Sequence, residues 1–187
     1  MTFYETERFV GNGAHAAFFR IRNHPKLGAK VVFTAEDGED ALKKELNIAR
    51  ILRSLGVSVP KYIDIIPIKI SEYVEEAFTK YKNINHTKNY RNSTILAKEF
   101  FEKNKNKILY GLVMEYIEDD IILDIKDKQF FSELKLEYIY KKECEKIEKL
   151  GIHIGDSNDY RNILWSKSRG KLYFIDFESW NISNITK

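Results

Sequence analysis

The chain has 187 residues, of which 43% are hydrophobic and 32% charged, so it can bury a core and is not disordered overall. Its net charge of +3 is too small to indicate a nucleic-acid partner, and its single cysteine excludes an internal disulfide. It begins with acids where a signal peptide would be basic, and no apolar stretch approaches the roughly 20 residues that span a bilayer. We therefore expect a cytoplasmic protein that makes no membrane contact.

The first half of the sequence predicts a strand-rich region with one long helix. Three strand-like stretches lie close together, with a turn-like GNGAHA between the first two, whereas Leu42, Ala49 and Leu52 recur at helical spacing. Gly56 is expected to end that helix, and Pro67 to interrupt the strand that follows it. The predicted strands are residues 6–10, 16–22, 26–33 and 62–70, and the predicted helix is residues 37–55.

The second half predicts a basic insertion, a linking strand, a long helix and a hairpin. The insertion, residues 80–107, holds eight Lys or Arg against two Glu, and Tyr81, Tyr90 and Phe100 within it could stack on bases. A solvated insertion is the alternative, and an acidic substrate could also dock on it. The predicted elements are a helix at 93–104, a strand at 108–117, a helix at 130–150, strands at 162–165 and 172–177, and a polar tail at 178–187.

Two features of the first half could bind a ligand. Gly11, Asn12 and Gly13 lie between two predicted strands, where glycines let backbone N–H groups approach phosphates, although an ordinary hairpin turn has the same composition. Lys30 stands in an apolar strand, and Glu45 borders the apolar face of the next helix. A Lys30–Glu45 ion pair could orient the ammonium group toward phosphates; the alternative is a snorkelling lysine and a solvated glutamate.

Two further features lie near the end of the sequence. In GIHIGDSNDYRNILW, Asp156 could position an attacking hydroxyl and Asn162 could bind a hard cation, unless both only stabilise a turn. Asp176 follows an apolar stretch in LYFIDFESW, where a carboxylate either binds a partner or metal or caps the next turn. A glycine turn, a strand lysine, a helix glutamate, an Asp–Asn loop and a strand aspartate thus follow one another in this order.

This order resembles the protein-kinase-like superfamily, over about residues 6 to 180. The GD…NIL and IDFE segments are similar to those of small atypical kinases, such as the RIO-type and lipopolysaccharide kinases and the aminoglycoside phosphotransferases. The resemblance implies an α+β, two-lobed fold with a strand-rich N-lobe at residues 1–117, including the insertion, and a truncated helical C-lobe at 118–187. It also implies ATP and Mg²⁺ as cofactors.

The resemblance assigns a role to each candidate residue. Lys30, held by Glu45, would contact the nucleotide phosphates, and Asp156 would orient the acceptor hydroxyl while Asn162 and Asp176 bind Mg²⁺. The segment that resembles the kinase hinge, Glu115 to Ile117, would hold adenine through backbone groups. The remaining nucleotide-binding residues are Gly11, Asn12, Gly13 and Ala14 in the glycine loop, and Glu115, Tyr116 and Ile117 in the hinge.

Two departures from the family pattern shape the functional prediction. Asn162 follows Asp156 by six residues, one more than the family spacing, and only eleven residues follow Asp176. We expect a minimal kinase acting on an unidentified hydroxyl acceptor, with a partner protein completing the C-lobe. The alternatives are a pseudokinase or ATPase-like module that binds nucleotide with a partner protein, and an RNA or anionic-surface binder that uses the insertion.

Overall fold

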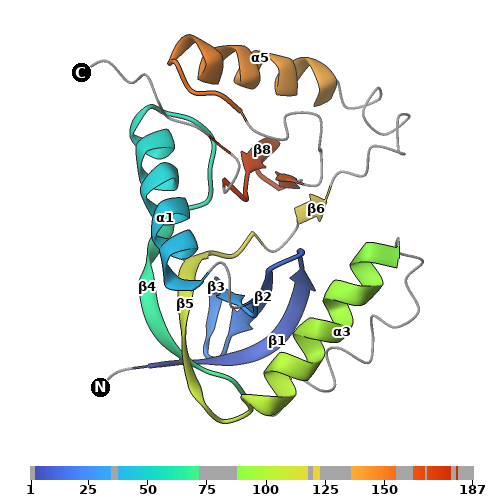
Figure 1. Cartoon of the computed structure of the whole chain (residues 1–187). Helices are drawn as coiled ribbons and strands as arrows, with labels where there is room; N and C mark the ends of the chain where they lie inside the picture. The colour runs from blue at the N-terminus through green and yellow to red at the C-terminus, as the bar shows by residue number, and fades with distance from the viewer. Residues whose placement is uncertain are drawn as a thin grey trace. The chain divides into compact units, whose positions relative to one another are not determined.

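The computed structural model describes residues 3–34, 38–71, 88–117, 120–122, 136–154, 162–166, 168–177 and 180 (Figure 1). The fold is α+β, as the sequence predicts. The chain forms two compact units. The first unit consists of Met1–Leu46 and Tyr62–Tyr116, and the second of Asn47–Lys61 and Ile117–Lys187.

A five-stranded sheet forms the first unit. Its strands are β1 (Tyr4–Asn12), β2 (Ala16–Ile21), β3 (His24–Val32), β4 (Tyr62–Lys69) and β5 (Ile108–Glu115), in the order β1-β2-β3-β5-β4. Neighbours in this order are antiparallel. A short parallel pairing of β1 with β4 closes the sheet into a barrel.

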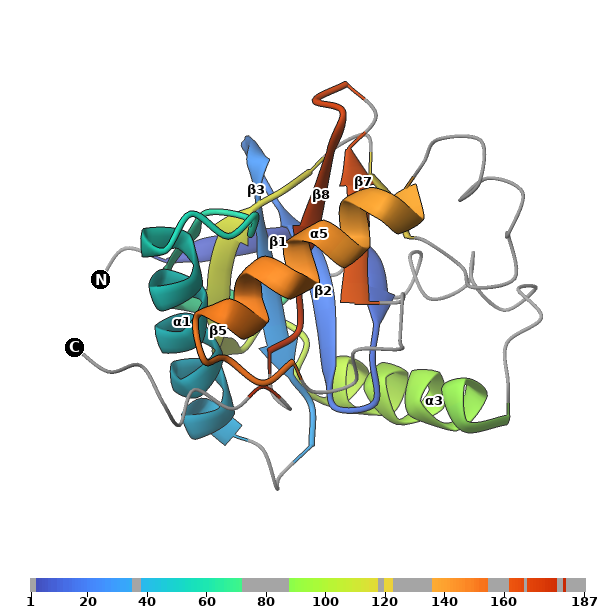
Figure 2. The same cartoon turned by 90° about the horizontal axis from the view of Figure 1, so that it is seen from above.

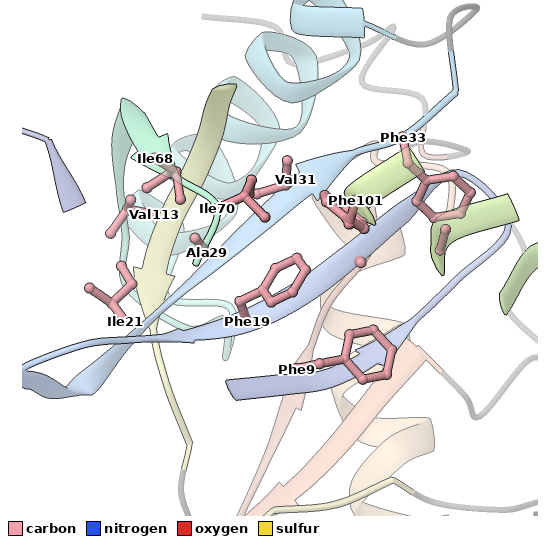
Figure 3. Packing of buried hydrophobic residues seen from close by; sticks show 12 residues of the cluster. Phe9, Phe19, Ile21, Ala29, Val31, Phe33, Ile68, Ile70, Phe101 and Val113 are labelled. Atoms are coloured by element: carbon pink, nitrogen blue, oxygen red, sulfur yellow. The ribbon is translucent and has the colours of Figure 1, made fainter. Parts of the chain in front are cut away.

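The sheet has two chemically different faces, because successive side chains of a strand point to opposite sides. Cross-strand partners share a face, so the registers Phe19–Ala29 and Ala29–Val113 place these three residues together. We call their side the apolar face; it carries most of the buried cluster in Figure 3. The opposite side, the polar face, carries Phe18, Arg20, Gly28 and Lys30.

Helix α1 (Gly38–Ser54) follows β3 and matches the sequence prediction. Leu42, Ala49 and Leu52 are buried at the helical spacing that predicted them. Gly56, with φ of +74°, ends the helix, and the N–H of Val57 donates to the carbonyl of Leu52 at 2.9 Å. Residues up to Leu46 belong to the first unit, and those from Asn47 to the second.

Helix α3 (Lys88–Lys103) lies along the β1–β2 hairpin (Figures 1 and 2). Ala97 and Phe101, one helical turn apart, are fully buried in the cluster of the apolar face. The ring of Phe101 meets those of Phe19 and Phe33 edge-on, at centroid distances of 5.0 and 6.2 Å. The interpretation of residues 80–107 as a solvated insertion is therefore wrong for this helix, whose apolar face completes the core.

The second unit pairs a helix with a small sheet. Strands β6 (Asp120–Ile122), β7 (Ile163–Ser166) and β8 (Lys171–Phe174) form an antiparallel sheet, and α5 (Leu136–Lys149) buries Leu136, Tyr140 and Ile147. Trp180 contacts Phe174 and Phe177 at centroid distances of 5.7 and 5.0 Å. The segment after α1 joins this unit, because the N–H of Phe174 donates to the carbonyl of Ser58 at 2.9 Å.

Several predictions about the strands were wrong in detail. Pro67 does not interrupt β4; it pairs with Tyr110 of β5, and the barrel's parallel pairing begins only at Ile68, so the missing N–H breaks no continuous ladder. Strand β5 ends at Glu115 and β8 at Phe174, both earlier than predicted, and Asp176 lies beyond β8 with a φ of +62°. Among the helices of the described ranges, none has the length and apolar character needed to cross a membrane.

Candidate functional site

A buried ion pair joins β3 to α1 on the polar face of the sheet. The ammonium nitrogen of Lys30 lies 2.6 Å from Oε2 of Glu45, and their side chains are 14% and 1% exposed. Burying a carboxylate without a partner is costly, so Glu45 depends on this contact. The ion pair predicted from the sequence is confirmed. Lys30 is the less buried partner of the two.

The structure adds Tyr62, which sequence reasoning missed. Its hydroxyl donates to Oε1 of Glu45 at 3.0 Å, so each oxygen of the Glu45 carboxylate has its own donor. Tyr62 begins β4 and is 7% exposed. No sequence signal distinguishes it from the other tyrosines of the chain, because the contact depends on how a helix and a strand pack.

The glycine-rich segment is a strand end and a short turn. Strand β1 continues through Gly11 and Asn12, which pair with Phe18 and Ala17 of β2, so only residues 13–15 connect the strands. Neither Gly11 nor Gly13 adopts a positive φ, and an added Cβ at either would meet no described atom within 4 Å. Folding therefore does not require glycine here, and no described atom fills the space beside the backbone. The N–H of Gly13 already donates to the carbonyl of Ala16 at 2.9 Å.

The side chain of Asn12 is engaged with α3. Its amide nitrogen donates to the carbonyl of Gly13 at 2.8 Å and to the hydroxyl of Ser93 at 3.3 Å. Its amide oxygen accepts from the hydroxyl of Thr94 at 3.2 Å. Asn12 pairs with Ala17, on the apolar face, whereas Lys30 is on the polar face. The side chain of Asn12 therefore holds the hairpin to α3 instead of facing a ligand beside Lys30; Ala14 is exposed in the turn.

An aromatic corner occupies the polar face beside the predicted hinge. The ring of Phe18 covers Gly28 so closely that an added Cβ would lie 2.2 Å from Cζ of Phe18. Phe18 also stacks near Tyr116, with centroids 6.2 Å apart and planes 19° apart. The guanidinium carbon of Arg20 lies 5.0 Å from the centroid of the Tyr116 ring. The two rings and the cation of this corner thus pack against one another.

The predicted hinge residues have different surroundings. Glu115 is the last residue of β5. The N–H of Tyr116 donates to the carbonyl of Lys26 at 2.9 Å, so it is already used inside the first unit and is a poor donor for a base. Ile117 is 3% exposed and begins the second long segment of the other unit.

The two predicted magnesium ligands lie near the same end of the β7–β8 hairpin. Asn162 directly precedes β7, and its carbonyl accepts from the N–H of Ile175 at 3.0 Å, one residue before Asp176. Asp176 has φ of +62°, an uncommon conformation outside glycine that clusters at functional sites. An amide and a carboxylate oxygen are suitable Mg²⁺ ligands when phosphates supply the rest.

Other chemistry is limited within the described ranges. No group of three or more His, Cys, Asp or Glu side chains gathers there as a metal site. Burial raises the pKa of the Cys144 thiol, which favours its unreactive protonated form. Asp156 lies outside the described residues, as does Tyr81 of the insertion. Phe100 is half-buried against the core and is therefore less available to stack on a base.

Neither models of known protein families nor curated proteins match this sequence. The functional assignment must therefore come from the residues that the fold brings together. In the first unit these are Lys30, Glu45 and Tyr62, with Gly11 and Gly13, which carry no side chains. In the second unit they are Asn162 and Asp176.

Proposed function

We propose that the chain is an Mg-ATP-dependent phosphotransferase with a minimal two-lobed, protein-kinase-like fold. The observation that carries the proposal is the ion pair of Lys30 with the buried Glu45, at 2.6 Å. In protein kinases a lysine on the third strand contacts the nucleotide phosphates and is held by a glutamate of the following helix. Lys30 is on β3 and Glu45 is on α1, which follows β3.

The proposal gives each unit a role. The first unit would be the N-lobe, with Lys30 placing a positive charge on the phosphates and the absence of side chains at Gly11 and Gly13 leaving room for their oxygens. The second unit would be the C-lobe, where Asn162 and Asp176 would hold Mg²⁺. The ion would neutralise phosphate charge.

The remaining step concerns the acceptor. Asp156 would orient the acceptor hydroxyl and take its proton, as the loop aspartate does in kinases. Catalysis would then come from positioning and from charges fixed in advance, which can supply most of the rate in phosphoryl transfer. The acceptor is a hydroxyl compound whose class is open, and a partner protein would complete the C-lobe.

Nucleotide binding is tested first, with Mg-ATP added to the wild-type chain in a calorimetric titration. Lys30→Met should weaken binding by at least about tenfold, because a charge-assisted contact of this kind contributes about 1.5–3 kcal/mol. The matched control is Lys26→Met, which removes the same charge from an exposed position on the same strand and should bind like wild type. Equal affinities of the two variants would contradict the proposal.

Turnover is tested by release of ADP from ATP and Mg²⁺, without and with a panel of hydroxyl acceptors. Asp176→Ala should abolish the activity of the wild-type chain. Equal residual activity in both proteins would remove the assignment of Asp176. Mg-dependent ATP binding without turnover would instead favour the second candidate, a nucleotide-binding module. The residues that support that candidate directly are Lys30 and Glu45, which act in binding.

A further inference from the structure

We infer that Tyr62 is a positioning residue, which fixes the Glu45 carboxylate and thereby the ammonium group of Lys30. The inference rests on the proposed function, because it assigns Lys30 to the phosphates of a nucleotide. It adds a third member to the pair, from a third element of the fold. The hydroxyl of Tyr62 donates to Oε1 of Glu45 at 3.0 Å, while Lys30 binds Oε2.

The two contacts engage both oxygens of the Glu45 carboxylate. With Lys30 alone, the terminal torsion of Glu45 would be broad, because rotation about a bond to a planar carboxylate has no sharp minima. A second donor on the other oxygen removes that freedom. Since Glu45 is 1% exposed, water cannot easily substitute for the hydroxyl. Lys30 then meets an acceptor at a fixed place and direction.

The backbone of β4 shows how Tyr62 reaches this position. Tyr62 pairs with Met114, and the register of β4 against β5 shifts between Tyr62 and Asp64. Such irregularities bend a strand and re-aim a side chain, and they are frequent beside active sites. Met114 in turn pairs with Gly28, two residues before Lys30 on the same face of β3. The hydrogen bond from the Tyr62 hydroxyl therefore links α1 to β4, while the ion pair with Lys30 links α1 to β3.

Tyr62→Phe is the variant that tests this role, because it removes the hydroxyl and keeps the buried ring. We expect Mg-ATP affinity to fall by about three- to tenfold, in line with the loss of one hydrogen bond to a charged group. In turnover the loss should appear in kcat as well as KM, because a loosened Lys30 is misplaced in the transition state. Tyr110→Phe is the control, since Tyr110 is 52% exposed on β5.

A second readout does not depend on ATP. The acylation rate of Lys30 by an N-hydroxysuccinimide ester is measured by peptide mass spectrometry in wild type, Tyr62→Phe and Tyr110→Phe. A held ammonium group reacts slowly, so Tyr62→Phe should label Lys30 at least about threefold faster, while the exposed Lys26 labels equally in all three. If Tyr62→Phe only destabilised the fold, the acylation rates of lysines throughout the chain would rise instead.

The outcomes separate the two proposals. If wild type binds no Mg-ATP, the proposed function falls, and the labelling rate of Lys30 alone decides whether Tyr62 holds it. If wild type binds Mg-ATP and Tyr62→Phe matches it in affinity, turnover and labelling, the role of Tyr62 is overturned and the function stands. If Tyr62→Phe does not fold, NMR of wild type decides. A slowly exchanging Tyr62 hydroxyl proton near the Glu45 side chain supports the inference, and its absence overturns it.

Discussion

The two faces of the five-stranded sheet are formed by the same strands but differ in the side chains that they carry and in the contacts that these make. On the apolar face, Phe19, Phe101 and Val113 are fully buried, and α3 supplies part of the packing. On the polar face, Lys30 forms a charged network with Glu45 of α1 and with Tyr62. Ala29 and Lys30 are neighbours in sequence and belong to opposite faces. Strand alternation thus places the aromatic cluster and the Lys30–Glu45 ion pair on opposite faces of the sheet.

The largest effect is expected on the apolar face. Phe101→Ala should lower the free energy of unfolding by about 3–5 kcal/mol, because it leaves a cavity among the aromatic rings. Chemical denaturation followed by circular dichroism measures the change. Ile95→Ala, at a position of α3 that is 56% exposed, is the control and should change stability little. Similar losses in both variants would mean that α3 does not pack by its Phe101 side.

A smaller effect is expected where the polar face is tightly packed. Gly28→Ala should cost about 1–3 kcal/mol, because the new Cβ would overlap the Phe18 ring. The double variant Gly28→Ala with Phe18→Leu should recover most of the loss, since the smaller side chain leaves room. Thermal unfolding of both proteins and of Phe18→Leu completes the cycle. Additive losses, with no recovery, would contradict the contact.

Removing the hydrogen bonds between the β1–β2 hairpin and α3 should lower the stability by a smaller amount still. Asn12→Ala removes the hydrogen bonds to Ser93 and Thr94 and should cost about 1 kcal/mol. Hydrogen exchange of the hairpin amides should rise locally. Asn92→Ala, at an exposed position on the same helix, is the control. If Asn12→Ala instead abolishes Mg-ATP binding without altering hairpin exchange, Asn12 contacts the ligand directly and the comparison of faces fails there.

The smallest effect on stability is expected at Asp176, in the second unit. Asp176→Gly relieves a left-handed conformation and should change stability by less than about 1 kcal/mol, in the stabilising direction. The same change should remove Mg-dependent turnover. Asn106→Gly, at a position with φ of +63°, relieves a similar strain with no proposed ligand role and should leave turnover intact. Retained turnover in Asp176→Gly would show that the strained aspartate does not bind the metal.

Local patterns predicted most of the elements but few of their contacts. The buried positions of α1 follow helical spacing, and the strands of the first sheet lie in strand-like stretches between turn-like residues, so both could be predicted from the sequence. The Lys30–Glu45 pair was predictable because a charged residue on an apolar strand needs a partner, and the next helix offered one. Each of these inferences compares residues within one element or in two consecutive elements of the chain.

The contacts that were missed join distant positions. The apolar residues of α3 include the exposed Ile95 and Leu96 as well as the buried Ala97 and Phe101, so only the packed sheet shows which of them complete the core. Asn12 and Ser93 lie 81 residues apart in the sequence, and neither residue type predicts the hydrogen bond between their side chains. Tyr62 is likewise one aromatic residue among many until β4 lies beside α1. The role of Asp156 stays a prediction, since it lies outside the described residues.

The closure of the barrel has a consequence for how the protein behaves in concentrated solution. Strands β1 and β4 would be the exposed edges of an open sheet, ready to pair with another molecule. Instead they pair with each other at Tyr4–Ile68 and Glu5–Lys69, and Glu5 lies 3.8 Å from Lys69 and 3.2 Å from Arg22. Charged side chains thus mark the seam where self-association would begin, and Pro67 next to it withholds a donor. Weakening this seam should promote aggregation before it affects ligand binding.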